Sequence, residues 1–442
     1  MRPRPPIPAG PYLIVGLARS GAAAACALRA RGERVIGVDA GAPAGMEELA
    51  ARGVELHLRD DGLARLEGTR AVVKSPGVPA QAPVVAAARE RGIPVLGELE
   101  LGWRLLANEF IAVTGTNGKT TTVELIGHIH RAAGLPVAVA GNVGAALSGL
   151  VGSVEEGATV VCETSSFQLE DALAFAPEAA VLLNITPDHL DRHGTVEAYR
   201  EAKLRIFARQ GEGDVAVVPA GPGEVSLPAG VRRVRFGEGG EAECALREGR
   251  VWWEGELLLA ADELRLRGAH NLQNAMAAAA VCLARGIDPG AVRAGLRSFP
   301  GVPHRLQEVA RSAGVLYVND SKATNVASTL VALRAFPEGG VHLILGGQGK
   351  GQDFAPLRDA VAASCRAVYL IGEDARQIAR ALKHAEISLH ECGDLERAVA
   401  AATAAAATGE VVLLSPACAS FDQFPDFEAR GERFLTLVAR VL

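Results

Sequence analysis

The chain has 442 residues, a length that corresponds to about three domains at roughly 150 residues each. Its 45 lysines and arginines stand against 51 aspartates and glutamates, and the formal net charge of −6 excludes the basic excess typical of nucleic-acid-binding surfaces. Hydrophobic residues make up 49% of the sequence, and no apolar run approaches the ~18 residues of a membrane helix, so we expect folded cores and neither a nucleic-acid nor a membrane partner.

The N-terminal third opens with a βαβ pattern. A short apolar run at residues 12–15 is followed by a glycine-bearing turn, an alanine-rich helix to about residue 31 and a strand-like run at 35–39. The turn, Gly16-Leu-Ala-Arg-Ser-Gly21, is not G-x-G-x-x-G, so the dinucleotide-binding fingerprint is weak. We expect a Rossmann-like domain over residues 1–97.

A second α/β pattern begins at the apolar strand 110–113, which runs into a glycine-rich turn and a helix from about residue 120. Further strands are expected at residues 137–140, 159–162 and 180–183. Residues 213–268 differ, because glycine and proline interrupt several short runs, and they predict a small antiparallel appendage. The central domain, a P-loop mononucleotide-binding α/β domain, is expected over residues 98–299.

The last part of the chain follows the proline- and glycine-rich residues 299–303. Strand-like runs alternate there with segments of helix length, which predicts a doubly wound, Rossmann-like domain over residues 300–442. The runs lie at residues 316–320, 341–347, 367–372, 386–392 and 410–416.

The seven cysteines are odd in number and widely scattered, and no two form a C-x-x-C pair. This pattern indicates reduced, mostly buried thiols and argues against a zinc site. The first residues carry two arginines, but Pro8, Gly10 and Pro11 interrupt any apolar segment, so we expect a cytoplasmic protein.

The sharpest local signal is Thr114-Gly-Thr-Asn-Gly-Lys-Thr-Thr121, which lies where a strand meets a helix. Backbone N–H groups and a helix N-terminus bind phosphate oxygens in such loops. We expect Lys119 to reach the β- and γ-phosphates of a nucleotide and Thr120 to ligate Mg²⁺. The general pattern G-x-x-x-x-G-K-[ST] would place a glycine at Val113, so an ordinary glycine-rich turn with an exposed lysine is the less favoured alternative.

Further motifs follow this loop in chain order. They are Glu163-Thr-Ser-Ser-Phe-Gln-Leu-Glu170, Asn184-Ile-Thr-Pro-Asp-His189, Tyr199-Arg-Glu-Ala-Lys203, His270-Asn271-x-x-Asn274, Pro303-His-Arg305, Asn319-Asp-Ser-Lys-Ala-Thr-Asn325, Gly346-Gly-Gln-Gly-Lys350 and Ser415-Pro-Ala-Cys-Ala-Ser-Phe-Asp-Gln-Phe424. With these motifs the sequence resembles the Mur ligase family, the ATP-dependent amide-forming enzymes of peptidoglycan assembly. The resemblance covers nearly the whole chain, and the S-S-F-Q-L-E and S-P-A-C-A-S-x-D-Q-F forms resemble the members that add D-glutamate.

The resemblance implies a ligase that joins D-glutamate to UDP-N-acetylmuramoyl-L-alanine through an acyl phosphate, with release of ADP and phosphate. In that reaction a carboxylate attacks the γ-phosphate of ATP, so cations must offset the repulsion between two anions. The implied cofactors are ATP, Mg²⁺ at two sites and a CO₂-derived carbamate on Lys203. We expect a monomer.

Five catalytic residues are implied by the resemblance: Lys119, Glu163, His189, Lys203 and Lys322. The implied metal ligands are Thr120, Glu163, His189 and carbamylated Lys203, although imidazole is an unusual ligand for Mg²⁺. Without the family match, Glu163 would be interpreted as a helix-capping carboxylate, His189 as a hydrogen-bonded core histidine and Lys203 as a solvated helix lysine.

The resemblance also implies three groups of binding residues. For ATP they are Gly115, Thr116, Asn117, Gly118, Lys119, Thr120, Thr121, Asn271, Arg305 and Asp320. For the UDP-linked substrate they are Gly16, Leu17, Ala18, Arg19, Ser20, Asp39, Ser75, Gly77, Asn142 and His189, with a strand-terminal cap as the alternative for Asp39. For D-glutamate they are Thr324, Lys350, Ser420 and Phe427, and Gln348 and Phe421 depart from the aspartate and leucine often found at their positions.

Other function classes stay open at this point. An NAD-dependent dehydrogenase would use residues 16–39 but would leave the Lys119 loop unexplained. A nucleotide-dependent switch would explain that loop but would not need Lys322, Lys350 or Ser420. A sister ligase could add a different amino acid, or add glutamate to folate.

Overall fold

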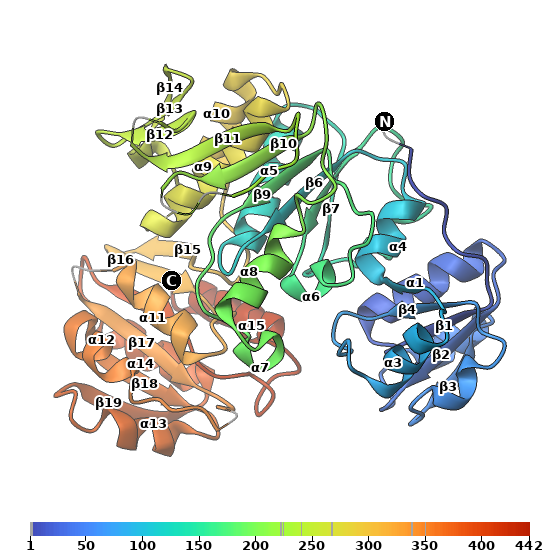
Figure 1. Ribbon diagram of the computed structural model, residues 1–442. Helices are drawn as coiled ribbons and strands as arrows, with labels where there is room; N and C mark the ends of the chain where they lie inside the picture. Colours follow the sequence, from blue (N-terminus) through green and yellow to red (C-terminus); the bar gives the residue numbers. More distant parts are fainter. Residues whose placement is uncertain are drawn as a thin grey trace. The chain divides into compact units, whose positions relative to one another are not determined.

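Three β-sheets built mainly from parallel strands organise the chain (Figure 1). The structure, a computed structural model, describes residues 3–221, 223, 225–239, 241–266, 268–336, 339–349 and 351–442. The chain divides into two compact units, Met1–Leu264 with His270–Phe299 and Arg265–Ala269 with Pro300–Leu442. The first unit contains two of the sheets and the second unit contains the third, which confirms the expected α/β class.

The first sheet has five parallel strands in the order β3-β2-β1-β4-β5, a Rossmann-like arrangement. Its strands are β1 (Tyr12–Val15), β2 (Val35–Asp39), β3 (Glu55–Leu58), β4 (Ala71–Lys74) and β5 (Val95–Gly97). Its helices are α1 (Arg19–Ala30), α2 (Met46–Ala51), the 3₁₀ turn η1 (Leu63–Leu66) and α3 (Pro83–Glu90). Alternate side chains of β1 explain the two cores, because Tyr12 and Ile14 pack with α1 whereas Leu13 and Val15 pack with α3.

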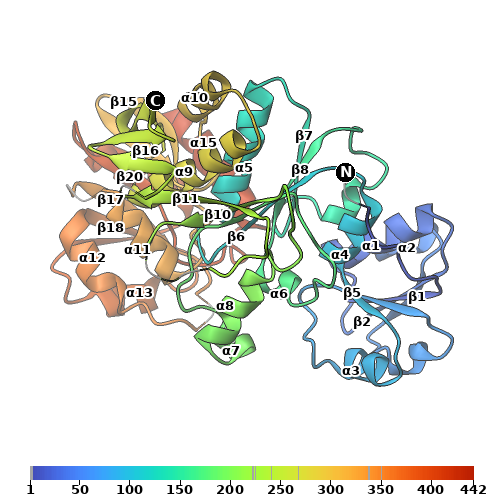
Figure 2. The same cartoon turned by 45° about the horizontal axis from the view of Figure 1, so that its top comes forward.

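Helix α4 (Glu98–Leu105) follows β5 and joins the two domains of the first unit (Figure 2). Its Leu101 packs into the core of the first sheet, whereas Leu99 and Trp103 pack into the core of the second. The carboxylate of Glu100 accepts the backbone N–H groups of residues 173–175. The helix is therefore fixed to both domains by apolar contacts and by a fully buried carboxylate.

The second sheet has nine strands in the order β14-β13-β12-β11-β10-β9-β6-β8-β7. The strands are β6 (Phe110–Thr114), β7 (Val137–Gly141), β8 (Thr159–Glu163), β9 (Ala179–Leu182), β10 (Val215–Pro219), β11 (Arg232–Glu238), β12 (Cys244–Arg247), β13 (Arg250–Trp253) and β14 (Glu256–Ala260). The helices are α5 (Lys119–Ala132), η2 (Leu147–Leu150), α6 (Ser166–Leu169), α7 (Leu190–His193), α8 (Val196–Leu204), η3 (Ala261–Glu263), α9 (Ala269–Ala284) and α10 (Pro289–Ser298).

The expected antiparallel appendage over residues 213–268 is smaller than predicted. Strands β10 and β11 pair in parallel with the central sheet and extend it, and β12 also pairs in parallel with β11. Only the pairs β12–β13 and β13–β14 are antiparallel. Short apolar runs predict strands but contain no information on strand direction, which tertiary pairing decides here.

The sheet of the second unit has six strands in the order β15-β16-β20-β17-β18-β19, and all pairs except β15–β16 are parallel. Its strands are β15 (Gln307–Ser312), β16 (Val315–Asn319), β17 (Val341–Gly346), β18 (Cys365–Ile371), β19 (Ser388–Gly393) and β20 (Val411–Leu414). Its helices are α11 (Val326–Arg334), α12 (Leu357–Ser364), α13 (Ala375–Leu382), α14 (Leu395–Ala405) and α15 (Phe427–Val441). Helices α11, α12 and α13 pack on one face and α14 and α15 on the other, so the unit is doubly wound as expected.

Two further observations concern the whole chain. All seven cysteines lie within the described residues and are free thiols, five buried and two half-buried. Among the helices of the described segments, none combines the length and apolar character needed to cross a bilayer.

Candidate functional site

Four neighbouring strands of the central sheet carry expected site residues at their carboxyl ends. Strands β7, β8, β6 and β9 are adjacent and parallel, so these ends meet along one edge of the sheet. The glycine-rich loop follows β6, Asn142 follows β7, Glu163 ends β8 and His189 follows β9. Parallel pairing therefore gathers residues that are up to about 75 positions apart in sequence.

The glycine-rich loop, residues 115–118, leads from β6 into the N-terminus of α5. Gly118 has φ of +86°, and a Cβ at this position would lie 2.1 Å from Oδ1 of Asn274, so only glycine fits. The Nδ2 of Asn274 donates to Oδ1 of Asn271 at 3.2 Å. Asn271, one of the residues expected to bind ATP, is thereby linked to the loop through Asn274.

Lys119 is the first residue of α5, and its ammonium group folds back onto the loop. Its Nζ donates to the carbonyl oxygens of Gly115 and Thr116, both at 2.9 Å. The loop is also held from the segment after β9, because the N–H of Asn117 donates to Oδ1 of Asn184 at 2.9 Å. The helix N-terminus, the loop and the lysine together form a concentration of positive charge that suits a polyphosphate.

Glu163 is buried at the end of β8 and contacts two other expected site residues. Its Oε2 accepts the hydroxyl proton of Thr120 at 2.8 Å, and its Oε1 accepts from Nδ2 of Asn142 at 3.2 Å. Both partners are side chains, so Glu163 does not cap a helix. The structure thus places a carboxylate and a hydroxyl oxygen side by side under the glycine-rich loop.

Lys203 lies on α8 but is not a solvated helix lysine, because only 2% of it is exposed. Its Nζ donates to the carbonyl of Gly115 at 2.7 Å and lies 4.6 Å from the centre of the Tyr199 ring. Burial, followed by the positive charge of Lys119, lowers the pKa of Lys203 to about 7. The buried environment therefore favours the neutral amine much more than solvent does.

His189 has a left-handed backbone conformation, with φ of +51°, and its side chain is 48% exposed. Its ring lies 4.8 Å from the ring of Phe167 and 6.3 Å from that of Tyr199. The alternative of a hydrogen-bonded core histidine is therefore wrong, because half of the side chain is in contact with solvent.

The donor set fits one Mg²⁺ ion better than two. Mg²⁺ prefers oxygen ligands, and the Glu163 carboxylate with the Thr120 hydroxyl provides two of them within 2.8 Å of each other. Within the described part of the chain, no three His, Cys, Asp or Glu side chains converge as a metal-binding set. A second oxygen cluster would require a new oxygen ligand, such as a carbamate on Lys203.

The N-terminal turn expected to hold the UDP-linked substrate is tightly tied together. A Cβ at Gly21 would lie 1.8 Å from the carbonyl of Gly16, so the turn packs against the start of α1. Ser75 Oγ donates to the same Gly16 carbonyl at 2.7 Å. Asp39 Oδ2 accepts the N–H of Leu17 at 2.7 Å, and the Leu17 side chain is buried in the core.

Two other residues of this group lie at the junction with the central domain. Arg19 Nη2 donates to the carbonyl of Asn142 at 2.9 Å, so the turn after β1 contacts the loop after β7. Gly77 is exposed in the turn after β4, and Ala18 is exposed beside Arg19. Ser20 is half-buried in the first turn of α1.

In the second unit, the turn after β16 contains three of the expected residues. Lys322 Nζ lies 4.6 Å from the centre of the Phe427 ring, and Thr324 follows it half-buried.

Asp320 is buried, and its carboxylate accepts the N–H of Leu306 at 3.1 Å and the hydroxyl proton of Ser415 at 2.8 Å. Burial raises the pKa of Asp320 to about 7. The half-buried Arg305 immediately precedes Leu306.

Ser420 lies buried in the loop after β20, and this loop pairs with the loop after β17. The N–H of Gln348 donates to the carbonyl of Ala419 at 3.0 Å, and the reciprocal bond is 2.9 Å. Phe421 is 61% exposed. Lys350 lies outside the described residues, so its expected place beside Ser420 stays a prediction.

Comparison with known proteins gives matches over almost the whole chain. The Mur ligase MurD-like N-terminal domain matches residues 11–97, the Mur ligase middle domain residues 113–282, and the Mur ligase glutamate ligase domain residues 304–418. The chain is 44% identical to the UDP-N-acetylmuramoylalanine--D-glutamate ligase of Pelotomaculum thermopropionicum, with 96% of each chain covered. It is 42% identical to the protein of the same name from Acidobacterium capsulatum, with 96% of this chain and 95% of the relative covered. The chain belongs to the Mur ligase family.

Solved structures of this family share the fold at lower identity. The UDP-N-acetylmuramate-alanine ligase MurC of Thermotoga maritima superimposes with a TM-score of 0.61 at 20% identity, covering 99% of this chain and all of that one. MurF of Acinetobacter baumannii gives 0.59 at 19% identity, covering 97% and 93%. The expected three-domain Mur architecture and the expected class of ATP-dependent amide ligase are confirmed.

One residue of this Mur ligase that organises the second unit was missed from sequence. Arg430 on α15 is 1% exposed, and its guanidinium donates to the carbonyls of Ser321 at 2.8 Å and Cys418 at 3.0 Å. Burial lowers its pKa to about 10, so it stays charged at neutral pH. It ties the Lys322 turn to the Ser420 loop. The sequence offered one signal for this role, an arginine one turn after Phe427 on the apolar side of the helix.

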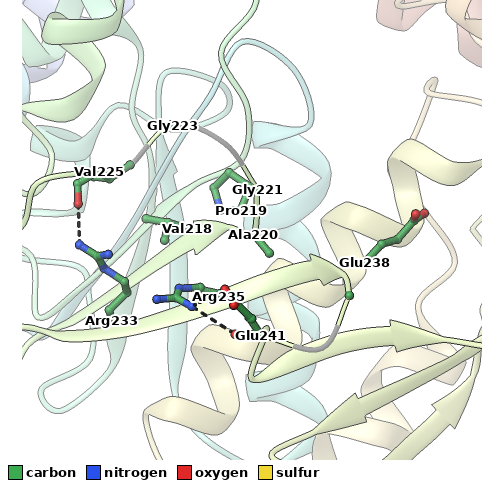
Figure 3. Close-up of a pocket in the computed structure, with 11 residues that line it drawn as sticks. Val218, Pro219, Ala220, Gly221, Gly223, Val225, Arg233, Arg235, Glu238 and Glu241 are labelled. Carbon is green, nitrogen blue, oxygen red and sulfur yellow. Dashed lines mark hydrogen bonds and ion pairs between the residues drawn. The ribbon is translucent and has the colours of Figure 1, made fainter.

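A hollow of about 450 Å³ at the carboxyl ends of β10 and β11 is a separate feature of this ligase (Figure 3). Arg233 donates to the carbonyl of Val225 at 2.7 Å, and Arg235 lies 3.6 Å from the Glu241 carboxylate. The residues that line it include none of the expected site residues. We assign it no role in the reaction.

Proposed function

We propose that this Mur ligase joins the amino group of D-glutamate to the alanine carboxylate of UDP-N-acetylmuramoyl-L-alanine, with conversion of ATP to ADP and phosphate. The observation that carries the proposal is 40–44% identity, over 95–97% of their length, to relatives named UDP-N-acetylmuramoylalanine--D-glutamate ligase. The reaction contributes to the synthesis of cytoplasmic peptidoglycan precursors. All residues that it needs lie on one chain, which is consistent with a monomer.

Each domain contributes most of the binding residues for one substrate in this proposal, and a few residues reach a substrate bound mainly by another domain. Residues 1–97 bind the UDP-linked substrate, residues 98–299 bind ATP and residues 300–442 bind D-glutamate. The tight turn around Gly16 and Ser75 suits a diphosphate, because a close backbone approach and a helix N-terminus favour anions. The loop at 115–118 suits the ATP phosphates for the same reason.

The first half-reaction transfers the γ-phosphoryl group to the alanine carboxylate. Lys119 neutralises charge on the phosphates and, to do so, exchanges its bonds to Gly115 and Thr116 for bonds to phosphate oxygens. Glu163 and Thr120 hold Mg²⁺, which withdraws charge from the phosphoryl oxygens when bound. Asn271, Arg305 and Asp320 position the nucleotide.

Lys203 acts as a carbamate in this proposal. Its neutral amine can form a bond to the carbon of CO₂ with loss of one proton, and the product replaces a cation by an oxygen ligand. Support comes from its burial and its lowered pKa of about 7, together with its hydrogen bond to Gly115 in the phosphate loop. His189 completes the ligand group at the same edge of the sheet.

The second half-reaction is the attack of the D-glutamate amine on the acyl phosphate. Lys322 and Thr324 lie on one turn, and Ser420 lies in the loop that Arg430 ties to it. With Lys350 as the partner of a carboxylate and Phe427 as an apolar wall, these side chains fix the amino acid at several points. Such fixation selects one enantiomer, because a misplacement of about 1 Å can cost on the order of 100-fold in rate.

The test is phosphate release measured against a panel of acceptors and amino acids. With UDP-N-acetylmuramoyl-L-alanine and ATP present, D-glutamate should support rapid release, and L-glutamate, L-alanine and meso-diaminopimelate should not. A preference for L-glutamate or another amino acid, or for a folate acceptor, would assign the chain to a sister activity. Because Gln348 and Phe421 depart from the usual residues, the amino-acid arm is the most informative.

A further inference from the structure

Two adjacent carboxylates directly after α6, Glu170 and Asp171, bind cationic side chains from two different domains. Asp171 Oδ2 lies 2.7 Å from Nζ of Lys74, at the end of β4, and both side chains are buried. Glu170 Oε2 lies 2.8 Å from Nη2 of Arg192, and its Oε1 lies 3.2 Å from Nδ1 of His193. This acidic pair therefore connects the N-terminal domain to α7, the short helix that follows His189.

Arg192 contacts three groups on two separate segments with one guanidinium group: Glu170 and Phe167 at α6, and Pro76 in the turn after β4. Its Nη2 bonds to Glu170, and its Nη1 donates to the carbonyl of Pro76 at 3.1 Å. Its Cζ lies 4.1 Å from the centre of the Phe167 ring. A planar fork with several donors can make these contacts together, whereas the single ammonium of a lysine cannot reproduce their geometry.

The two ends of this connection are both segments that carry proposed substrate-binding residues. Pro76 lies in the turn 75–77, between Ser75 and Gly77. The Phe167 ring, on which Arg192 stacks, is also 4.8 Å from the ring of His189. The opposite side of the turn is fixed separately, because Lys74 Nζ donates to the carbonyl of Val78 at 2.7 Å.

We propose that Arg192 is a positioning residue for the UDP-linked substrate, which holds the turn 75–77 at a fixed separation from His189. The inference rests on the proposed function, since it takes Ser75, Gly77 and His189 as binding residues for that substrate. Arg192 acts through these neighbours: it supports the turn through the Pro76 carbonyl and His189 through Phe167. Its loss should weaken the UDP-linked substrate and leave the loop at 115–118 intact.

The main experiment uses Arg192→Met, which keeps an apolar stem over Phe167 and removes the fork. We expect the KM for UDP-N-acetylmuramoyl-L-alanine to rise about 10-fold or more, the effect of losing a charged hydrogen-bond donor. The KM values for ATP and D-glutamate should stay within about 2-fold, because the methionine keeps the packing on Phe167 that supports His189 and removes only the polar bonds to Glu170 and Pro76. Titration calorimetry of the UDP-linked substrate without ATP should show the same loss of affinity.

Two further variants separate positioning from general stability. Arg205→Met is the matched control. Arg205 Nη1 also donates to Glu170, at its backbone carbonyl at 2.6 Å, but this bond does not involve the turn 75–77. It should leave all three KM values unchanged. Arg192→Lys keeps the positive charge at Glu170 and should show a smaller loss with the same selectivity, which provides the measurement if the methionine variant does not fold.

Three results would overturn the inference: an unchanged KM for the UDP-linked substrate in the Arg192 variants, an equal rise in all three KM values, or an equal loss in Arg205→Met. The proposed function fails differently. A wild-type chain that does not bind UDP-N-acetylmuramoyl-L-alanine in the calorimeter contradicts the function itself, whatever the variants do.

Discussion

At the scale of single residues, the environment of Lys203 is unusual for an ammonium group. The side chain is buried among Tyr199, Gly115 and Lys119, and the cost of a buried charge is only partly offset by one hydrogen bond to Gly115. The pKa near 7 is the result. A lysine held in this state is a nucleophile at neutral pH, whereas a solvated lysine is almost entirely protonated.

The carbamate proposal predicts chemical rescue. Lys203→Ala should reduce turnover by about 100-fold or more, the usual cost of removing a group that stabilises transition-state charge. Formate or acetate should restore part of the activity by supplying the missing oxygen ligand. Lys203→Arg should stay inactive, because guanidinium does not form a carbamate. Full activity of the arginine variant in the phosphate-release assay would contradict the proposal.

Asp320 predicts a pH dependence of stability. Its folded-state pKa of about 7 lies above the ordinary 3.8, so the folded chain binds this proton more tightly than the unfolded chain. The contribution of Asp320 to stability is therefore fully present below pH 3.8 and is lost as the pH rises towards 7. In urea unfolding at pH 5 and pH 8, wild type should lose stability relative to Asp320→Asn at the higher pH. A difference between the two chains that is independent of pH would show that Asp320 is ionised throughout.

At the scale of secondary-structure elements, the junction of β6, the glycine-rich loop and α5 depends on backbone conformation. Gly118, the residue directly before α5, has a left-handed conformation, and a Cβ there would lie 2.1 Å from Oδ1 of Asn274 on α9. The glycine-rich loop and α9 are far apart in sequence but are in contact at Gly118, and a side chain at this position would push them apart. The loop keeps its shape only if both the conformation and the contact are preserved.

Gly118→Ala should therefore weaken ATP binding by about 10-fold or more, because it adds both strain and a clash at Asn274. Gly134→Ala is the matched control at the other end of α5. Gly134 also has positive φ, +69°, but a Cβ there would meet no atom within 4 Å. The control should lose only about 1 kcal/mol of stability and keep its affinity for ATP in fluorescence titration. Equal affinity of the two variants for ATP would remove the loop from the nucleotide site.

The elements that could be predicted from sequence are those with a strong local pattern. The run Phe110–Thr114 followed by Gly-Thr-Asn-Gly-Lys defines a strand, a turn and a helix start, and the structure has all three. β15 was missed, because its residues Gln307–Ser312 are polar and half-exposed and become a strand only by pairing with β16. The direction of β10 and β11 was wrong for the same reason.

The site followed the same division. The loop motif indicated a phosphate-binding turn, because its chemistry lies within a few consecutive residues, whereas Glu163 was assigned to the site only through the family resemblance. The burial of Lys203 depends on Gly115, 88 positions away, and the role of Arg430 depends on Ser321, 109 positions away. Helical spacing contains no information on such partners, so only the structure could reveal them.

At the scale of the whole molecule, the proposed substrates divide between the two compact units. The turns proposed for the UDP-linked substrate and the loop proposed for ATP belong to the first unit, and the turn of Lys322 and the loop of Ser420 belong to the second. Each unit has its own core, so each can respond to its ligand separately.

Hydrogen exchange tests this division. UDP-N-acetylmuramoyl-L-alanine added alone should slow amide exchange at residues 16–20 and 75–77 and leave residues 321–324 and 418–424 unchanged, since ligands stabilise the part that they contact. ATP with Mg²⁺ should slow exchange at residues 114–121. Protection of residues 418–424 by the UDP-linked substrate alone would contradict the proposed assignment of domains.

The hydrogen bond from Lys203 to Gly115 has a consequence for the proposed carbamate. A carbamate nitrogen retains one hydrogen, so this donor is still available to the Gly115 carbonyl after CO₂ is added, while the new carboxylate extends beyond it. In the proposal, the unmodified lysine already makes this bond to the loop, and carbamylation would add charge without a change of hydrogen-bond partner at Gly115. The conformation of the loop at 115–118 should therefore not depend on the fraction of Lys203 that carries the carbamate. NMR with ¹³C-labelled CO₂ measures that fraction directly.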